Sequence, residues 1–332
     1  MRDLEPIQPL PIHKRVAIPG SNRVIMERLD KEFRMKLSLR FLPITKHYSL
    51  PLLAIGFLLV SFPQLPAQEL SKLPYVPTPQ IVVDEMLKIA NVTAKDFVVD
   101  LGSGDGRMII TAARNFKANG LGVDIDSKLV ELSNKQAKAD GVEDRAKFIE
   151  QDMFKADIGK ATVVTLYVLP DFMEKLRPKL LSELKPGSRI VAHDYYMSEW
   201  HPDRQFSLTV PEKVKANGTD KAYLYLWVVP SIVRGDWRME FDAGGSDRQL
   251  IVLDFAQQYQ IINASAENIL GPMKIDNALL RGDEISFDLS IGANSYRFTG
   301  KVTDGKMEGS AVAPGSGRPV SWRASKLAAQ KK

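Results

Sequence analysis

A glycine-rich segment in the first half of the chain has the residue types of a turn that holds a nucleoside-containing ligand. It runs from Val98 to Arg107 and has glycine at Gly102, Gly104 and Gly106. A backbone without Cβ atoms can turn tightly and lie against a ligand, and the free N–H groups of a following helix face the same ligand. The dinucleotide fingerprint G-x-G-x-x-G needs glycine where this chain has Arg107. The turn therefore predicts a cofactor site and disfavours a nicotinamide oxidoreductase.

Two acidic residues further along the chain are spaced to hold the other parts of such a ligand. Asp124 ends the next apolar run, twenty residues after Gly104, where a carboxylate can accept hydrogen bonds from both ribose hydroxyls. Asp152 follows the third apolar run, where an acid can reach an adenine amino group while Met153 packs beside the ring. An acid in either position can also cap a helix or a turn. In this register the ligand role is the favoured interpretation.

The segments around these residues alternate short apolar runs with amphipathic stretches of helix length. Strands are predicted over 97–101, 120–124, 147–151, 163–169, 189–194 and 223–229. Helices are predicted over 80–90, 108–117, 127–139 and 172–184. Strands regularly separated by helices imply crossover connections. The expected fold is therefore α/β, a doubly wound, mostly parallel sheet with helices on both faces.

The pattern changes after Pro230 to short alternating runs joined by glycine-containing turns. In Glu284–Ile291 every second residue is apolar, which places the apolar residues on one face of a strand. Trp237 and Trp322 are expected in the core of this part. A small antiparallel β-meander or barrel is predicted over 231–327, after an α/β domain over 69–230 and a leader over 1–68.

Charge and cysteine content exclude several classes of function. Residues 1–50 carry ten Lys/Arg and five Asp/Glu, which accounts for the whole formal charge of +5. The remaining 35 basic and 35 acidic residues balance, so no nucleic-acid partner is predicted. The chain has no cysteine, and only His193 and His201 lie beyond the leader. Disulfides and thiolate catalysis are excluded, and no metal site is predicted.

The leader contains an uncharged apolar run from Leu50 to Phe62, preceded by the basic residues Lys36, Arg40 and Lys46. This arrangement predicts a secretory signal peptide with cleavage after Ala67. The run is shorter than the ~20 residues of a membrane-spanning helix, but a membrane anchor and a buried helix stay open as alternatives. The expected location is exported, periplasmic or extracellular, or membrane-anchored through this run, with a cytoplasmic location as the remaining alternative.

The order and spacing of the motifs resemble those of the class I, seven-strand S-adenosylmethionine-dependent methyltransferases. The residues that the resemblance assigns to S-adenosyl-L-methionine are Asp100, Gly102, Gly104, Gly106, Asp124, Asp152 and Met153. It implies that the glycine-rich turn surrounds the methionine part, that Asp124 binds the ribose, and that Asp152 binds the adenine.

Three segments resemble, more narrowly, a family of protein-lysine N-methyltransferases found in mitochondria and prokaryotes. They are the run from Tyr75 to Pro79, the glycine-rich turn, and the run from Tyr167 to Pro170. The family also has an apolar segment just upstream of its Tyr-Val-Pro motif. The resemblance implies a protein substrate methylated on lysine, with Tyr75, Thr78 and Pro170 on the substrate side. Tyr75 and Thr78 can equally form a rigid lead-in to the first helix, and the resemblance ends near Pro230.

Methyl transfer is an in-line displacement, in which positioning, exclusion of water and removal of a proton supply most of the acceleration. Ligands of open α/β sheets collect at the carboxyl ends of the strands. The groups after the fourth and fifth predicted strands are Tyr167, Pro170, Asp171, His193, Asp194, Tyr195 and Tyr196. Tyr167, His193 and Asp194 are the predicted catalytic residues, with Asp194 or His193 accepting the proton and aromatic faces stabilising a cation. For His193 a hydrogen-bonded structural role is the favoured interpretation over that of a base.

The predicted function is an S-adenosylmethionine-dependent methyltransferase that acts on a protein side chain such as lysine. The alternative is a non-catalytic cofactor-binding or scaffold protein of the cell envelope that acts through its β domain. The leader motivates this alternative, because an exported domain would meet little S-adenosylmethionine.

Overall fold

A computed structural model describes residues 5–6, 75–214, 218–241, 249–313, 315 and 318–328. The run from Leu50 to Phe62 and the boundary expected at residue 68 lie outside these residues, so the signal peptide stays a prediction. Within the described ranges no helix is both long enough and apolar enough to cross a membrane.

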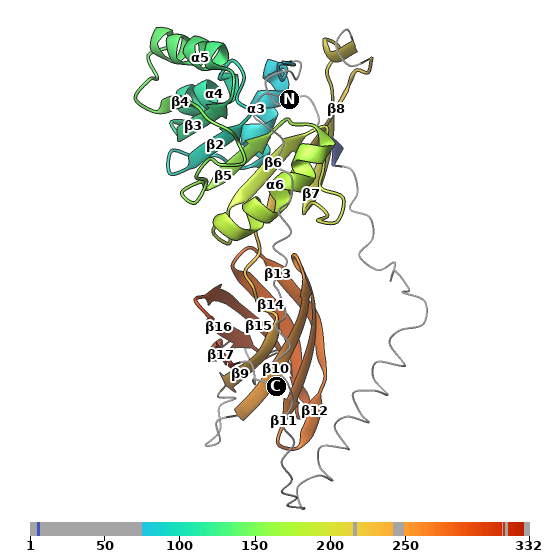
Figure 1. Ribbon diagram of the computed structural model, residues 1–332. Coiled ribbons are helices and arrows are strands. Elements are labelled where there is room, and N and C mark those ends of the chain that lie inside the picture. The colour runs from blue at the N-terminus through green and yellow to red at the C-terminus, as the bar shows by residue number, and fades with distance from the viewer. Residues whose placement is uncertain are drawn as a thin grey trace, which may run out of the picture. The chain divides into compact units, whose positions relative to one another are not determined.

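The α/β domain contains one mixed sheet of order β1-β7-β8-β6-β5-β2-β3-β4 (Figure 1). Its strands are β1 (Glu5–Pro6), β2 (Phe97–Leu101), β3 (Asn119–Asp124), β4 (Ala146–Glu150), β5 (Val163–Leu166), β6 (Arg189–His193), β7 (Arg204–Thr209) and β8 (Lys221–Val228). Strands β2 to β6 pair in parallel, and β8 pairs antiparallel with both β6 and β7. The predicted doubly wound, mostly parallel seven-strand sheet is confirmed, and the two-residue β1 extends it at one edge.

Helices of the described residues cover both faces of this sheet (Figure 1). They are α3 (Gln80–Ile89), α4 (Arg107–Phe116), α5 (Ser127–Ala139) and α6 (Pro170–Glu183). Successive side chains of β2 enter opposite cores: Val98 packs with α3 and α4, whereas Val99 and Leu101 pack with α6. Strands buried on both faces in this way read as continuous apolar runs, which is why the sequence revealed them.

Two details of this sheet differ from the sequence-based expectation. Strand β7 was not predicted, because only Phe206 of its residues is buried and the polar residues around it hide the alternation. The strand predicted over 163–169 ends at Leu166, so Tyr167 lies in the loop before α6.

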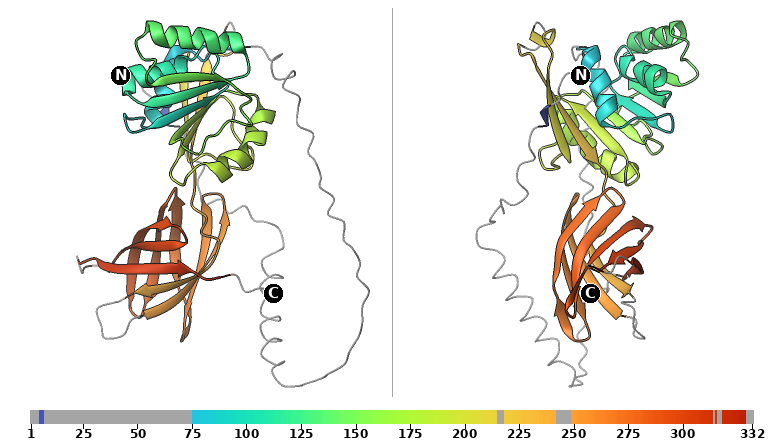
Figure 2. Two further views of the ribbon diagram at one scale, coloured as in Figure 1. Left: turned by 60° about the vertical axis from the view of Figure 1, so that its left-hand side comes forward. Right: turned by 180° about the vertical axis from the view of Figure 1, so that it is seen from behind.

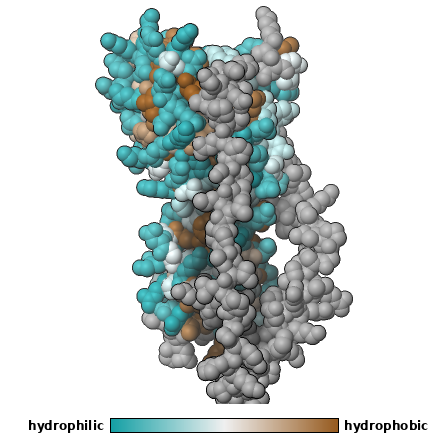
Figure 3. All heavy atoms as spheres, in the orientation of Figure 1, coloured by the Kyte–Doolittle hydropathy of each residue, from teal (hydrophilic) through white to brown (hydrophobic). Residues whose placement is uncertain are grey.

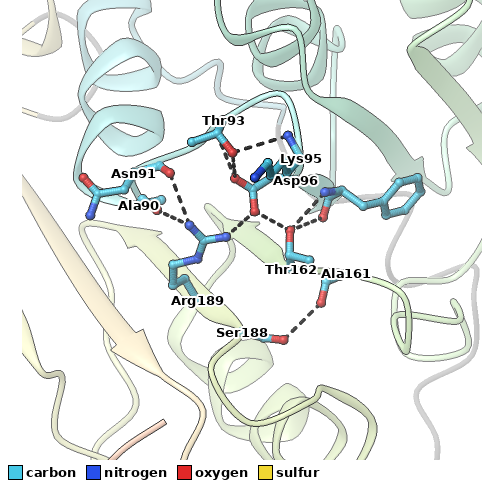
Figure 4. A network of polar contacts seen from close by, with 10 residues as sticks. Ala90, Asn91, Thr93, Lys95, Asp96, Ala161, Thr162, Ser188 and Arg189 are labelled. Carbon is cyan, nitrogen blue, oxygen red and sulfur yellow. Dashed lines mark hydrogen bonds and ion pairs between the residues drawn. The ribbon is translucent and has the colours of Figure 1, made fainter. Parts of the chain in front are cut away.

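A polar network joins the amino-terminal ends of β2, β5 and β6 (Figure 4). The glycine-rich turn follows the opposite, carboxyl end of β2. One oxygen of Asp96 accepts hydrogen bonds from Arg189 and from the Thr162 hydroxyl, the latter at 2.7 Å. The other oxygen accepts from the backbone N–H of Thr93 at 2.8 Å. Arg189 also donates to the carbonyl of Ala90 at 2.8 Å. The network therefore fastens the end of α3 to β5 and β6.

The β domain is a nine-stranded antiparallel sheet of order β12-β11-β10-β9-β17-β16-β15-β14-β13. Its strands are β9 (Gly235–Phe241), β10 (Gln249–Gln258), β11 (Ile261–Asn268), β12 (Gly271–Met273), β13 (Ile275–Arg281), β14 (Glu284–Ile291), β15 (Asn294–Thr303), β16 (Lys306–Val312) and β17 (Val320–Lys326). Figure 2 shows these strands wrapped into a nearly closed barrel. The expected antiparallel β domain is confirmed.

Large side chains fill the interior of this barrel. Trp237 and Trp322 are buried, as expected, and the rings of Phe287 and Phe298 stack with their centroids 5.0 Å apart. Among the residues that Figure 3 colours, hydrophilic ones predominate and hydrophobic ones form scattered patches. The buried aromatic and aliphatic side chains show that the interior of the barrel is a packed core.

Candidate active site

A cavity of about 470 Å³ lies at the carboxyl ends of the parallel strands, where β2 separates β3 from β5. It is bordered by residues 75–78, 102–105, 124–126, 151–153 and 166–169. The sequence-predicted residues that line it are Tyr75, Thr78, Asp100, Gly102, Gly104, Asp124, Asp152, Met153 and Tyr167. Most of the predicted cofactor residues and both predicted residues of the lead-in are therefore brought to one cavity.

The backbone of the glycine-rich turn needs its glycines for two different reasons. Gly104 has φ +53°, and a Cβ atom there would lie 2.4 Å from Cε2 of Tyr75 on the cavity wall. Gly106 has φ +78° and precedes α4, where a Cβ atom would meet the ring of Phe148 at 2.7 Å. Gly104 thus leaves room for the Tyr75 ring on the cavity wall. Gly106 does not line this cavity and instead allows close packing of the turn against Phe148 of the sheet.

Asp124 ties the end of β3 to the turn. One of its carboxylate oxygens accepts a hydrogen bond from the backbone N–H of Gly104 at 2.7 Å, and the other accepts from that of Asp126 at 3.0 Å. Each oxygen keeps lone-pair capacity for further donors. The carboxylate is therefore fixed in the cavity wall and can accept hydrogen bonds from hydroxyl groups of a ligand.

Asp100 lies at the base of the cavity and is 8% exposed. Its carboxyl accepts a hydrogen bond from the Thr165 hydroxyl at 2.7 Å. Burial raises the pKa of Asp100 to about 7. The Thr165 hydrogen bond opposes that rise, and the negative charges of Asp124 and Asp105 add to it. A cation bound beside this carboxyl would favour its ionised form.

Arg107 connects the turn to the lead-in before α3. Its guanidinium pairs with Asp105 at 2.6 Å and donates to the carbonyl of Thr78 at 2.7 Å. Burial raises the pKa of Tyr75 to about 12, with further increases from the charge and hydrogen bond of Asp105. Arg107, whose presence in place of glycine disfavours a dinucleotide site, therefore fixes the segment 75–79 at the cavity wall.

Two residues on the adenine side show different geometry. Met153 lines the cavity, and so does Asp152. One oxygen of Asp152 accepts from the backbone N–H of Phe154 at 2.9 Å, so this acid also caps its own turn. The turn-capping interpretation of Asp152 and its ligand role are thus compatible.

Ser103 lines the cavity and was not identified from the sequence. It is 6% exposed, and its hydroxyl has no hydrogen-bond partner within the described ranges. An unpaired buried hydroxyl is costly, and a polar ligand group would satisfy it. This orphaned hydroxyl, on a residue that lines the cavity, fits the cavity to a polar ligand. Its place between two turn glycines was the one available sequence signal.

His193 packs against the cavity residue Tyr167 and lines neither this cavity nor the second cavity described below. It is 1% exposed, and its ring lies 4.1 Å from the ring of Tyr167, measured between centroids. Burial lowers the pKa of His193 to about 4. The nearby Asp194 opposes this shift, and the positive charge of Lys213 reinforces it. The imidazole is therefore neutral at pH 7 and is separated from the cavity by Tyr167.

Asp194 forms an ion pair with a buried lysine whose burial was not predicted from the sequence. Its carboxylate lies 2.5 Å from Nζ of Lys213, which is 3% exposed and also donates to the carbonyl of Lys221 at 2.8 Å. The other oxygen of Asp194 accepts from the backbone N–H of Tyr223 at 3.1 Å. Asp194 has φ +60°, an uncommon conformation for a residue with a side chain. These contacts fasten the end of β6 to β8. A lysine in a polar segment carries no sequence signal of such burial.

A second cavity of about 330 Å³ lies beside the first. It is lined by Pro170, Asp171, Glu174, Asp194, Tyr195, Tyr196 and Ser198. Tyr195 lines both cavities. Pro170 and Asp194 therefore lie on the second cavity and not on the first. Within the described ranges no cluster of residues could hold a metal ion.

The chain is similar to known methyltransferases in the region of these cavities. The family model of the ANTKMT methyltransferase domain matches residues 100–204. A protein-lysine N-methyltransferase of Saccharolobus islandicus is 45% identical over 130 residues, which cover 39% of this chain and 81% of that relative. The adenine nucleotide translocase lysine N-methyltransferase of Mus musculus is 27% identical over 128 residues, covering 39% of this chain and 52% of that protein.

A solved structure with high identity is an RNA methyltransferase from Salinibacter ruber in complex with S-adenosyl-L-homocysteine. It is 46% identical, with a TM-score of 0.43, and the match covers 48% of this chain and 96% of that one. The chain spans about half the length of the mouse relative.

Proposed function

The chain belongs to the protein-lysine N-methyltransferase family of S-adenosylmethionine-dependent methyltransferases, and from this premise we propose that the cavity at the ends of β2, β3 and β5 is its active site. The methyl acceptor is a lysine of a protein substrate. The observation that carries the assignment is the single cavity that gathers the turn glycines, Asp124, Asp152 and an unpaired Ser103 hydroxyl.

Each part of this cavity suits one part of S-adenosyl-L-methionine. Asp124 presents fixed carboxylate oxygens to ribose hydroxyls, while Asp152 and Met153 border the space for the adenine. The turn and Ser103 border the space for the methionine part, and Asp100 lies at its base. Asp100 and Asp124 provide negative charge for a ligand that carries a sulfonium and an ammonium group.

The methyl donor, when bound, supplies an electrophilic methyl carbon on a sulfonium. The acceptor nitrogen forms a bond to that carbon while the carbon–sulfur bond breaks, its electron pair stays on sulfur, and a proton leaves the nitrogen. Tyr167 and Tyr195 line the wall on the acceptor side, where their ring faces can stabilise positive charge. Positioning and exclusion of water are the main contributions expected of these side chains.

The predicted proton acceptors have geometries that favour supporting roles. His193 is neutral and screened by Tyr167, and the carboxylate of Asp194 is paired with Lys213. We therefore propose that both position the Tyr167 and Tyr195 rings and that water takes the proton. Replacing Asp194 with Asn tests this: a positioning role leaves the shape of the pH–rate profile unchanged, and a catalytic base removes its acidic limb.

The location of the protein is a separate proposal that rests on the leader. The run from Leu50 to Phe62 motivates export or membrane attachment of the chain. Sequencing the natural N-terminus tests it, because cleavage after Ala67 leaves Gln68 as the first residue.

The experiment that tests the function combines cofactor binding with labelling. The full-length protein is incubated with S-adenosyl-L-methionine carrying a tritiated methyl group and with protein and RNA fractions of the source cell. We expect tritium in protein that protease releases and nuclease does not, and less of it with an Asp124→Ala variant at a subsaturating concentration of the methyl donor. Tritium in RNA, or none despite cofactor binding by calorimetry, would reject a protein substrate.

A further inference from the structure

We propose that the second cavity, between the start of α6 and the loop after β6, receives the acceptor lysine of the protein substrate. The inference rests on the proposed function. Its starting point is Tyr195, which lines both this cavity and the cofactor cavity. The two cavities therefore meet at Tyr195, next to the place where methyl transfer is proposed.

The three carboxyl groups around this cavity are not equivalent. Asp194 is paired with Lys213, and Glu174 is paired with Arg177 at 2.5 Å. Asp171 is exposed and makes no hydrogen bond or ion pair within the part of the chain that the structure describes. It is therefore the carboxylate that is free to attract the ammonium group of a lysine.

Aromatic rings continue from the acidic rim toward the cofactor cavity. Tyr196 is half exposed, and its ring centroid lies 5.4 Å from that of Tyr225. The rings of Tyr195 and Tyr167 stack at 6.2 Å with an angle of 15° between their planes. Ring faces attract ammonium groups and also pack against the methylene chain of lysine. The rim carboxylate can attract the ammonium group as it enters, and the ring faces can then stabilise that group deeper in, beside the cofactor cavity, while the methylene chain packs behind it.

The loop that carries these tyrosines is held at both ends. At one end, Lys213 and the backbone of Tyr223 bind Asp194, and the backbone N–H of Asp194 donates to the carbonyl of Tyr223 at 2.7 Å. At the other end, one oxygen of Glu174 accepts from the N–H of Ser198 at 2.6 Å and from its hydroxyl at 2.8 Å.

Burial acts to raise the pKa of Glu174, but these hydrogen bonds and Arg177 outweigh it and hold that pKa below its usual range. Glu174 is therefore an ionised anchor for Ser198. A loop fixed in this way presents Tyr195 and Tyr196 without an ordering cost on binding.

Fluorine NMR of the full-length protein labelled with 3-fluorotyrosine tests the subsite directly. S-Adenosyl-L-homocysteine is kept saturating, and Nα-acetyl-lysine methylamide is the probe. Tyr195→Phe and Tyr196→Phe variants identify the two resonances. We expect both to shift saturably with the probe and to stay in place with its Nε-acetylated form, which carries no charge. Unshifted resonances would overturn the proposal.

A matched pair of charge variants measures the role of Asp171. Asp171→Asn is expected to raise the Kd of the probe about fivefold, the effect of one exposed ion pair. Asp144→Asn makes the same change at an exposed acid that lines neither cavity and should leave the Kd unchanged. Equal Kd values for the two variants would contradict the role of Asp171.

Cofactor binding separates failure of this subsite from failure of the proposed function. The calorimetric Kd of S-adenosyl-L-homocysteine is expected to be the same in Asp171→Asn, Asp144→Asn and unchanged protein. If S-adenosyl-L-homocysteine binds and protein is labelled, but the tyrosine resonances do not respond to the probe, the function stands and the lysine subsite is rejected. If S-adenosyl-L-homocysteine does not bind, the proposed function itself fails.

Discussion

Asp100 is the residue whose environment most clearly requires a ligand. It is buried at the end of β2, and its only hydrogen-bond donor among the described residues is the hydroxyl of Thr165. Two further acids, Asp105 and Asp124, contribute negative charge near it. An ionised carboxyl in such a place is unfavourable in the free protein and becomes favourable beside a cation. The site is therefore coupled to pH.

We expect the affinity for S-adenosyl-L-methionine to rise as the pH increases through about 7, where burial places the pKa of Asp100. Below that value the carboxyl is protonated, and binding of a cation must displace the proton. Calorimetry in buffers of different ionisation enthalpy measures the proton released. Asp100→Asn should flatten the pH dependence, and an unchanged dependence in this variant would contradict the assignment.

The same raised pKa has an opposite consequence for stability. Because the pKa of Asp100 is higher in the folded protein than its usual 3.8, the folded state binds more protons between pH 4 and 7. Stability from this group is thus present at low pH and is lost as the pH rises to about 7. Denaturant unfolding should show Asp100→Asn gaining more stability relative to the unchanged protein at pH 8 than at pH 5.

Asp124 combines a structural and a ligand role in one carboxylate. Asp124→Ala removes the acceptor of the Gly104 N–H and the proposed ribose contacts. We expect binding of S-adenosyl-L-homocysteine to weaken by about 1–3 kcal/mol. Calorimetry measures this, with circular dichroism to show that the variant is folded. Undiminished affinity in a folded variant would remove Asp124 from the site.

At the scale of elements, the pair of Lys213 and Asp194 fastens β6 to β8 across the segment that carries Tyr195 and Tyr196. Lys213→Met leaves the mostly buried carboxylate of Asp194 without its cation. Breaking a buried pair on one side is expected to cost about 3 kcal/mol, and Lys213→Met/Asp194→Asn should recover part of this. Urea unfolding measures the free energy of unfolding of the unchanged protein, of Lys213→Met and of the double variant. Equal values for all three would show that the pair contributes nothing to stability.

Most elements could be predicted because burial leaves a periodic pattern. Glu284–Ile291 was expected as one strand and is β14, with Ile285, Phe287 and Leu289 inside the barrel. Strand β7 was missed because its buried residues are too few to form a pattern. The end of β5 was placed too late because the apolar residues after Leu166 line the cavity and do not continue the strand.

Site residues that directly follow successive strands could be predicted from their positions in the sequence. Features that arise from contacts between distant segments could not. The turn, Asp124 and Asp152 reach the cavity because they follow consecutive parallel strands. The burial of Lys213, the orphaned hydroxyl of Ser103 and the screening of His193 by Tyr167 arise from tertiary contacts. No local sequence feature encodes them, so roles assigned by residue type alone were incomplete.

At the scale of the whole molecule, the β domain makes specific contacts with the α/β domain. The indole N–H of Trp200 donates to the side chain of Gln260 at 2.9 Å, and its ring stacks on Tyr259 at 5.8 Å. The side-chain amide of Gln260 donates to the carbonyl of His201 at 2.7 Å. All residues that line the two cavities nevertheless lie between Tyr75 and Ser198.

Removal of residues 231–332 is therefore expected to lower the Tm without changing the affinity for S-adenosyl-L-homocysteine below it. The fully buried Trp200 would be uncovered on one side, and exposure of a large apolar side chain is destabilising. Scanning calorimetry and titration of the shortened protein measure both effects. Loss of binding at temperatures where the shortened protein is folded would show that the β domain takes part in the site.

Mass spectrometry of the methylated product tests the central claim most directly. The full-length protein reacts with its labelled acceptor and with S-adenosyl-L-methionine carrying a deuterated methyl group, and peptides of the acceptor are then fragmented. We expect the deuterated methyl group on the side-chain nitrogen of lysine. A deuterated methyl group on another side chain or on a nucleotide would contradict lysine methylation by this active site.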